Sequence, residues 1–598
     1  MKRYLLPVLT AVLLLLFYLG LPELDRIYPD RLRPAANRGT KDRRKKIDRF
    51  DALLMSVFTA VFGFVDFYRL GNAESVETFV QLGGKQAVIS LATPAVPDKL
   101  ALYSGVGYGT YFIEASSDGV GYTQIAEFTQ DAGYVLRWNY IVPETLVSEN
   151  GTAVPVSFLR ISASGSPWLG EVCVAVSGEN GEEHLSQVSS DLPELTDEQE
   201  LYCSRYSFMN STYFDEIYHV RTAWEHLNNV YPYEISHPPL GKLIISLGIL
   251  LFGMTPFGWR FSGTLFGVLM LPILYVLLRK LFISRRAAAA GTLVFATDFM
   301  HFVQTRIATI DTYSVFFILL MYLFMYIYID ENSLSALALC GISFGLGAAS
   351  KWTSIYAGAG LAVIWVIHRI VNRKEGFAAF VRNSLFCILF FVLIPGLIYY
   401  LSYLPYGASR GIGNPFSEAY LDIVLSNQQY MFSYHSGLVA THPYSSVWYQ
   451  WILDIRPILY YLEYEGTLRS SFGAWVNPIL CWGGLLAMFL VLYEAVFRRD
   501  RNALFILIGY LSQLLPWIFV KRLTFAYHYF PSCVFLVLAV AFVFRRMEQG
   551  NRHFKCYIWG YAGLSAAVFV LFFPALTGIW VNNAVATTVL QWLPTWPF

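Results

Sequence analysis

Residues 214–242 read FDEIYHVRTAWEHLNNVYPYEISHPPLGK and lie just ahead of a series of long apolar runs. The stretch opens with an acidic pair, Asp215 and Glu216, and closes with HPPLGK, from His237 to Lys242. Ionisable groups beside a bilayer are costly unless they are solvated, paired or functional. We therefore predict that this stretch is an active-site loop just outside a membrane span.

The composition is that of a polytopic membrane protein. Of 598 residues, 56% are hydrophobic and only 14% are charged. Several apolar runs reach about 20 residues, which is enough for a helix to cross a bilayer. The formal net charge is +1, and no basic stripe occurs outside the short loops between these runs. A nucleic-acid partner is therefore not expected.

The seven cysteines show no metal-ligand spacing. Five of them lie in or beside apolar runs and are interpreted as small hydrophobic residues. Cys173 and Cys203 could form a disulfide if their region faces an oxidising space, but sequence alone does not bring them together.

Residues 1–50 precede a predicted span at 51–70. Met1 to Arg3 lead into an apolar run to about Gly20 with no convincing cleavage site, so a retained span is expected rather than a signal peptide. Residues 31–49 are strongly basic, and such a cluster beside a span belongs on the cytoplasmic side. The span at 51–70 would then cross the membrane from the cytoplasm to the outside.

Residues 71–200 change character. Short alternating segments such as 87–91, 111–115 and 156–161 are separated by Gly, Ser, Asp and Asn, which is typical of an antiparallel β-sandwich. Several pieces resemble, in their order, the discoidin or galactose-binding-like sandwich: 100–103, 112–119, 122–123, 158–161 and 170–172. That resemblance implies a sugar-binding module, and a spacer without a ligand is the alternative.

Basic loops between the later apolar runs test the topology. If 52–68 crosses outward, loops at 279–286, 369–382, 498–501 and 545–546 all fall inside, and all are basic. Eleven spans after the N-terminal run satisfy this pattern, near 52–68, 259–278, 287–304, 312–329, 335–349, 353–367, 384–404, 476–496, 503–519, 526–544 and 557–579.

The same topology collects polar segments on one outer face. They are the sandwich, a catalytic outer loop at 201–258, Ser350-Lys351-Trp352, the outer loop 405–475 within the membrane core at 259–580, Lys521-Arg522, and the tail 581–598. Lys351 and Arg522 could simply extend toward lipid headgroups. Basic groups that converge with an acidic pair would instead suit a phosphate bound at the membrane surface.

A set of motifs follows in a fixed order. They are FDE at 214–216, HPPLGKL at 237–243, WRF at 259–261, QTR at 304–306, IDTY at 310–313, SKW at 350–352, HPYSSVWY at 442–449, RPI at 456–458 and TFAYHY at 524–529. In order and topological position they resemble the protein O-mannosyltransferase family. That group comprises polyprenyl-phosphate-sugar glycosyltransferases with the GT-C fold, and the similarity covers about 50–70 and 205–580.

The resemblance implies a lipid-linked donor, a polyprenyl phosphate mannose, and transfer to a hydroxyl outside the cytoplasm with inversion at the anomeric carbon. A hydroxyl is a poor nucleophile, and a carboxylate that takes its proton would accelerate the reaction by roughly 10² to 10⁴-fold. We assign Asp215 as this catalytic base. Glu216 is expected to orient the loop or pair with a cation, and a solvated acid is the alternative.

The departing lipid phosphate needs fixed positive charge. Four basic residues are donor-phosphate candidates by position, and only some are expected to touch the phosphate: Lys242, Arg260, Lys351 and Arg456. Arg260 begins a span and could be a topology anchor instead.

Four further residues are expected to support the site. His237 and His442 lie in family-like motifs, and His237 could orient the carboxylates or be structural. Arg306 and Asp311 are expected to form an ion pair that ties two spans together.

The chain departs from the family in its outer loops. Eukaryotic members carry a β-trefoil domain in the outer loop that corresponds to 405–475 of this chain. This segment is too short for such a domain, and a sandwich precedes the acidic pair instead. This indicates a bacterial plasma-membrane enzyme and leaves the acceptor open between protein Ser/Thr, a cell-wall polymer and a glycolipid; the sugar is also open. A dimer stays possible.

No metal or cofactor is expected besides the donor substrate, because the acidic pair lacks a second ligand group such as Asp-x-Asp. A polytopic transporter and an inactive family member are the alternatives to an active transferase. A transporter would show internal repeats and polar interruptions near the middle of paired spans.

Overall fold

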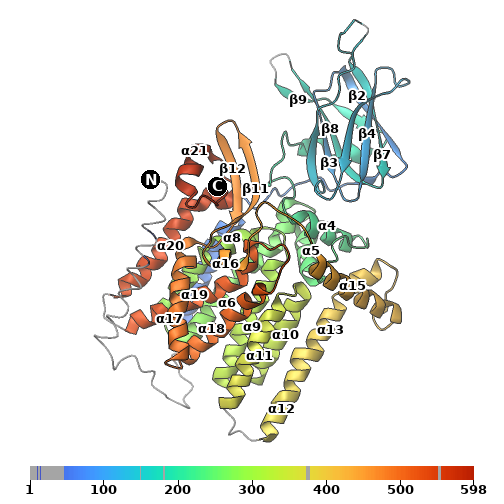
Figure 1. The fold of residues 1–598 in the computed structure, drawn as a ribbon. Helices are drawn as coiled ribbons and strands as arrows, with labels where there is room; N and C mark the ends of the chain where they lie inside the picture. Colours follow the sequence, from blue (N-terminus) through green and yellow to red (C-terminus); the bar gives the residue numbers. More distant parts are fainter. Residues whose placement is uncertain are drawn as a thin grey trace. The chain divides into compact units, whose positions relative to one another are not determined.

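The computed structural model describes residues 46–148, 150–178, 182–371, 377–549 and 554–598, together with Thr10 and Leu14 (Figure 1). The predicted span near the N-terminus, most of the basic 31–49 cluster, and Arg373 and Lys374 lie outside the described residues. The chain divides into two compact units. A membrane unit contains residues up to Tyr68, Ile235–Leu243 and Gly263–Phe598, and an outer unit contains Arg69–Glu234 and Ile244–Ser262.

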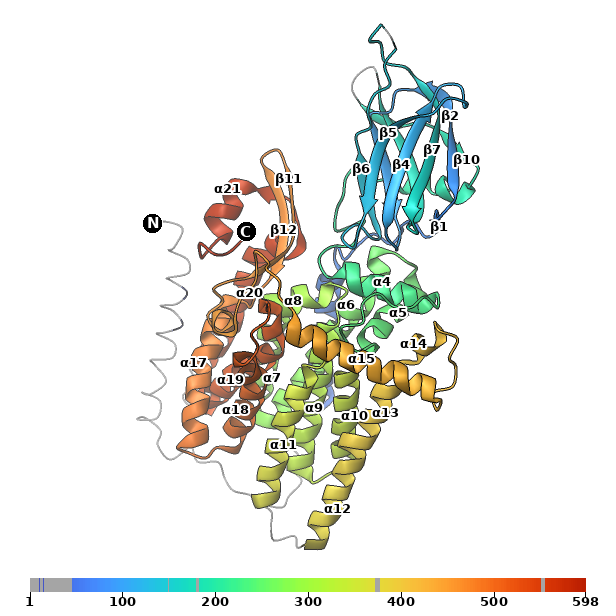
Figure 2. The same cartoon turned by 45° about the vertical axis from the view of Figure 1, so that its right-hand side comes forward.

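The outer unit contains the predicted antiparallel sandwich. One sheet has the order β1-β8-β3-β6 with β9 added to β8, and the other has the order β10-β2-β7-β4-β5 (Figure 2). The strands are β1 Val80–Gln81, β2 Gln86–Ala95, β3 Lys99–Ser104, β4 Gly109–Ser116, β5 Thr123–Gln130, β6 Arg137–Ile141, β7 Val156–Gly165, β8 Trp168–Ser177, β9 Glu183–Leu185 and β10 Val188–Ser190.

Alternation of apolar and polar residues explains why these strands form two layers. In β2 the buried residues are Ala87, Ile89 and Leu91, and in β4 they include Tyr111 and Ile113. These side chains point to one face because successive residues of a strand alternate sides. They pack with the inner faces of β7 and β8 into one core.

The thiols of Cys173 and Cys203 are both free. Cys173 lies in a buried cluster with Tyr103 and Trp138, and Cys203 packs against its edge. The disulfide that the sequence left open is therefore not formed.

The predicted catalytic outer loop contains two helices, α4 Glu216–Leu227 and α5 Leu240–Phe252. The segment 201–258 is thus partly helical. The apolar run of α5 has only 13 residues, which is too short to cross a bilayer and so was not recognised as a helix.

Eight helical segments among the described residues are long and apolar enough to span a membrane. They are α3 Arg49–Phe67, α6 Pro256–Phe282, α9 Asp311–Glu331, α11 Ser354–Val371, the segment Phe380–Ala408 with α12 Phe377–Ile388, α13 Ile394–Leu401 and α14 Leu404–Ala408, α17 Pro478–Val496, the segment Ala526–Gln549 with α19 Phe530–Gln549, and α20 Phe554–Thr577.

Three of the eleven predicted spans are shorter or interrupted. The run at 287–304 is divided into α7 Arg285–Ala296 and α8 Phe299–Arg306, because Asp298 caps α8 by accepting from the His301 amide at 3.0 Å. The other two are α10 Leu334–Ser350 and α18 Arg501–Leu514, with 17 and 14 residues.

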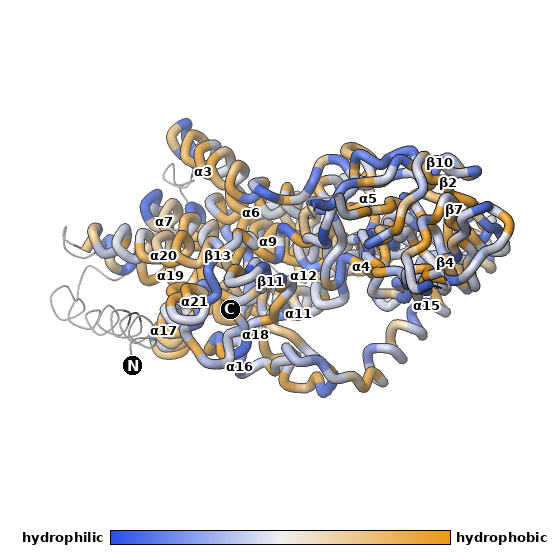
Figure 3. The backbone as a smooth tube through the Cα atoms, turned by 90° about the horizontal axis from the view of Figure 1, so that it is seen from above, coloured by the Kyte–Doolittle hydropathy of each residue, from blue (hydrophilic) through white to orange (hydrophobic). Residues whose placement is uncertain are grey.

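A buried carboxylate fixes α3 to its neighbours. Asp51, in the first turn of α3, accepts from the Tyr275 hydroxyl at 2.7 Å and from Arg285 Nε at 2.9 Å. The rest of α3 is largely hydrophobic (Figure 3), and only 11% of its most apolar window is buried in the protein. An apolar and exposed helical surface of this kind suits contact with lipid.

The segment 405–475 and the C-terminal tail form one structure. After α15 Glu418–Gly437 and α16 Trp448–Ile452, strands β11 Ile458–Glu465 and β12 Leu468–Ala474 pair with each other, and β12 pairs with β13 Val581–Asn582. Trp475 packs against Phe598 at a ring-centroid distance of 4.2 Å. The predicted tail is therefore a packed part of the membrane unit.

Candidate active site

The acidic pair stands at the start of α4 in the outer unit. Asp215 occupies the N-cap position without making a side-chain capping bond, and its side chain is partly exposed. Phe214 directly before it has φ +48°, in the left-handed region that bulky residues rarely adopt. Such backbone strain is often found at functional sites.

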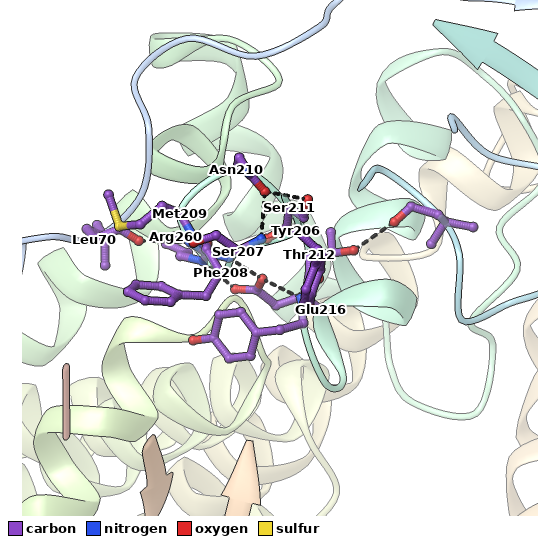
Figure 4. A network of polar contacts seen from close by, with 12 residues as sticks. Leu70, Tyr206, Ser207, Phe208, Met209, Asn210, Ser211, Thr212, Glu216 and Arg260 are labelled. Atoms are coloured by element: carbon purple, nitrogen blue, oxygen red, sulfur yellow. Dashed lines mark hydrogen bonds and ion pairs between the residues drawn. The ribbon is translucent and has the colours of Figure 1, made fainter. Parts of the chain in front are cut away.

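Glu216 forms a buried ion pair with Arg260 on α6 (Figure 4). Arg260 Nε and Nη2 donate to the two carboxylate oxygens, both at 2.7 Å. Both side chains are fully buried. The prediction that Glu216 pairs with a cation is confirmed.

Arg260 also holds three backbone carbonyls. It donates to Leu70 at 2.9 Å, to Phe208 at 2.6 Å and to Ser211 at 2.9 Å. Its guanidinium therefore makes at least five hydrogen bonds within the outer unit, which suits a structural role.

The HPP segment is held through its backbone in the membrane unit. Asn427 Nδ2 donates to the Ile235 carbonyl at 3.0 Å, His435 Nε2 to the Ser236 carbonyl at 2.8 Å, and Lys242 Nζ to the His237 carbonyl at 3.0 Å. Three consecutive carbonyls thus have side-chain donors, and two prolines without amide donors follow them. Lys242 is fully buried.

Lys351 forms an ion pair that joins two helices. Its Nζ lies 2.7 Å from Asp311 Oδ1, and it lies 5.4 Å from the centre of the Tyr527 ring. Asp311 begins α9 and Lys351 caps the end of α10. The ion pair between spans that was expected for Asp311 is formed, with Lys351 as its partner.

The other predicted residues make contacts of their own within the membrane unit. Arg306 donates to the Tyr68 carbonyl at 2.7 Å, and Arg456 donates to the Pro443 carbonyl at 2.6 Å. His442 Nδ1 accepts from the Tyr444 amide at 3.2 Å. Burial lowers the pKa of His442.

A basic pocket of about 400 Å³ opens in the membrane unit. Its walls include Lys351, Lys521, Arg522, His237 and His435, together with Trp352, Tyr356 and Trp517. The described residues that line this pocket include no carboxylate. It can therefore hold an anion.

His435 contributes a neutral ring to the basic pocket. Burial, together with the nearby His237, Arg522 and Lys351, lowers the pKa of His435 to about 4. Its ring lies 5.2 Å from that of His237.

Sequence reasoning found one of the pocket's three lysine and arginine residues and missed two. Lys351 was predicted, whereas Lys521 and Arg522 were only placed on the outer face. Their adjacency between two apolar runs was the available signal. Lys242, Arg260 and Arg456 are not among the residues that line this pocket.

The fold has a counterpart among solved structures. The structure of the Saccharomyces cerevisiae protein O-mannosyltransferase Pmt1-Pmt2 complex bound to the sugar donor is similar, with a TM-score of 0.57 and 13% identity over 65% of this chain and 89% of that one. The chain is thus a polytopic membrane protein with the GT-C glycosyltransferase fold and an inserted β domain.

Family models make the assignment more specific. Residues 236–401 match the family described as dolichyl-phosphate-mannose-protein mannosyltransferase, and residues 421–596 match the C-terminal four TMM region of protein-O-mannosyltransferase. The chain belongs to the protein O-mannosyltransferase family.

Curated relatives carry the same family name. The polyprenol-phosphate-mannose--protein mannosyltransferase of Mycolicibacterium smegmatis is 26% identical over 64% of this chain and 87% of its own length. That of Mycobacterium tuberculosis is 24% identical over 64% and 86%. These matches favour the transferase over the transporter alternative.

Proposed function

We propose that this protein transfers mannose from a polyprenyl phosphate to a hydroxyl of a protein Ser or Thr. The basic pocket, in a chain of this family, is the observation that carries the proposal. The mycobacterial relatives are named for the same donor and for a protein acceptor. The basic loops between the spans support a reaction on the outer side of a bacterial plasma membrane.

The donor phosphate binds in the basic pocket. Lys351, Lys521 and Arg522 supply positive charge there, and Lys351 also forms an ion pair with Asp311 at 2.7 Å. Fixed cations at a low-dielectric boundary stabilise the charge that develops on a departing phosphate. They therefore lower the barrier to breaking the bond between the sugar and the phosphate.

The isoprenoid chain of the donor occupies an apolar pocket of about 370 Å³. This pocket is lined by residues of α9, α10, α11 and α12, including Ile355, Ala359 and Trp365. Helix α11 contributes to both sites, because its Tyr356 lines the basic pocket. A phosphate in one pocket and its hydrocarbon chain in the other are thus bound along one helix.

Asp215 is the base in this reaction. The acceptor oxygen attacks the anomeric carbon and gives its proton to the Asp215 carboxylate, while the bond to the phosphate breaks and polyprenyl phosphate leaves. Displacement in one step inverts the configuration at that carbon. Glu216 does not take part, because both of its oxygens accept from Arg260.

Transfer of radiolabel tests the proposal. Purified protein is supplied with labelled polyprenyl phosphate mannose and a membrane extract as acceptor. Label should pass to a protease-sensitive product, and Asp215→Asn should abolish it. Arg522→Ala should weaken donor binding by about 10-fold, because one charged contact to the phosphate is lost.

Arg382→Ala is the matched control, because Arg382 is exposed on α12 and does not line the basic pocket. Label found in a protease-resistant glycolipid or polymer would show that the acceptor belongs to one of those classes and is not a protein. Native donor binding by Arg522→Ala would reject the pocket as the phosphate site.

A further inference from the structure

The segment that carries Asp215 is hydrogen-bonded to the β-sandwich. Three residues ahead of Asp215, the Thr212 amide donates to the Leu136 carbonyl at 3.2 Å and Thr212 Oγ1 donates to the Val135 carbonyl at 2.7 Å. Val135 and Leu136 belong to the loop between β5 and β6. All three residues are buried, so water does not compete for these bonds.

The amide, hydroxyl and carbonyl of Thr212 are all hydrogen-bonded. Its carbonyl accepts from the Tyr206 hydroxyl at 3.0 Å, and the Tyr206 ring lies 3.9 Å from the Arg137 guanidinium at the start of β6. The preceding residue, Ser211, accepts from the Trp138 amide through its Oγ at 3.4 Å. The sandwich thus fixes two consecutive residues of the segment.

A second anchor lies directly after Asp215. Glu216 is held by Arg260, so only three residues, 213–215, lie between the Thr212 anchor and this one. Left-handed backbone at a bulky residue such as Phe214 costs roughly 1–2 kcal/mol. Such a conformation persists only where the surroundings fix the chain on both sides.

The far end of α4 also contacts the sandwich. Trp224 packs edge-on against Trp168 with ring centroids 5.6 Å apart, and the Arg221 guanidinium lies 4.8 Å from the Tyr108 ring. Trp168 begins β8, and Tyr108 lies between β3 and β4. The sandwich therefore contacts both the segment just ahead of α4 and the far end of that helix.

We propose that the loop between β5 and β6 positions Asp215 for catalysis, with Thr212 as the positioning residue. The inserted sandwich then contributes to catalysis by holding the catalytic base in place, whether or not it also binds a ligand. This inference rests on the proposed role of Asp215 as the base.

Loss of this anchor should reduce turnover rather than donor affinity. A base must lie within hydrogen-bond reach of the proton it takes. A displacement of 1 Å lowers the rate by about 10²-fold. The donor phosphate binds to the basic pocket, none of whose residues lies in the outer unit, so its affinity should not change.

Three variants of the full-length protein test the inference. Thr212→Val keeps the shape but removes the bond to Val135, and kcat should fall by about 10-fold with an unchanged KM for polyprenyl phosphate mannose. Thr212→Ser retains the hydroxyl and should restore kcat. Thr110→Val is the matched control, since its hydroxyl bonds to that of Thr129 at 3.0 Å within the sandwich, and it should behave as native.

The possible results separate this inference from the function itself. If Asp215→Asn is inactive while Thr212→Val has native kcat, the positioning role is wrong and the base is right. If Asp215→Asn retains native activity, the assigned base is wrong. If Thr212→Val does not fold, Tyr206→Phe removes the bond to the Thr212 carbonyl, and native kcat in that variant would overturn the inference.

Discussion

Replacing Glu216 by Gln should destabilise the outer unit through the charge that remains on Arg260. Glu216 accepts two bonds of 2.7 Å from Arg260, and both side chains are fully buried. Removing one partner of a buried ion pair costs about 3–5 kcal/mol, because the other charge stays buried without compensation. Three backbone carbonyls still accept from Arg260, so we expect the lower end of this range.

The loss is measured as a shift of the apparent Tm in detergent. About 3 kcal/mol corresponds to roughly 6–12 °C for a unit of this size. The double variant Glu216→Leu with Arg260→Met removes both charges and should recover a large part of the shift, since replacing a buried pair by apolar side chains is often neutral. A double-mutant cycle with the two single variants then gives the coupling energy.

One outcome would refute this reasoning. Glu216→Gln protein that melts at the native temperature but transfers no sugar would place Glu216 in the chemistry rather than in the framework. Asp215→Asn is the comparison, and it should leave the Tm unchanged while abolishing transfer.

Three further predictions concern the membrane unit. Burial raises the pKa of Asp454 well above its usual range. The protonated carboxyl therefore carries no stability cost below about pH 4, and the folded state loses stability as pH rises toward the raised pKa. Asp454→Asn should raise the apparent Tm more at pH 8 than at pH 5, and an equal gain at both would contradict this. Lys351→Met should weaken donor binding about 10-fold or more and lower the Tm, because it removes a pocket cation and leaves Asp311 buried without its partner; native donor affinity would contradict its place in the phosphate site. Ala362→Phe, in the apolar pocket, should raise KM for a long-chain donor but not for a short-chain analogue, and an equal effect on both would reject this pocket as the site of the isoprenoid chain.

The sequence predicted the architecture where local pattern decides it. Alternating residues in β2 and β4 have a period of two, which indicates a half-buried strand before any partner is known. Long apolar runs likewise predicted the spans, because the length and composition of a run indicate that its helix can cross a bilayer.

Partners and interruptions were harder to predict because they depend on three-dimensional neighbours. Asp311 and Arg306 are close in sequence, which suggested that they pair. The helix that begins at Asp311 lies beside α10, however, and Lys351, the residue that caps the end of α10, forms the ion pair with Asp311. Asp298 looks like an isolated polar residue within an apolar run, and only the structure shows that it caps α8 and divides the span. Lys521 and Arg522 resembled interfacial residues until the basic pocket brought them together with Lys351.

The neutral state of His435 has a consequence for the conditions in which the protein can work. With a pKa of about 4, its ring stays uncharged through mildly acidic surroundings. Lys351, Lys521 and Arg522 in the same pocket carry charge whose titration range lies far above that of histidine. His435 should therefore add no charge to the basic pocket in mildly acidic surroundings, where the lysine and arginine residues of the pocket stay charged.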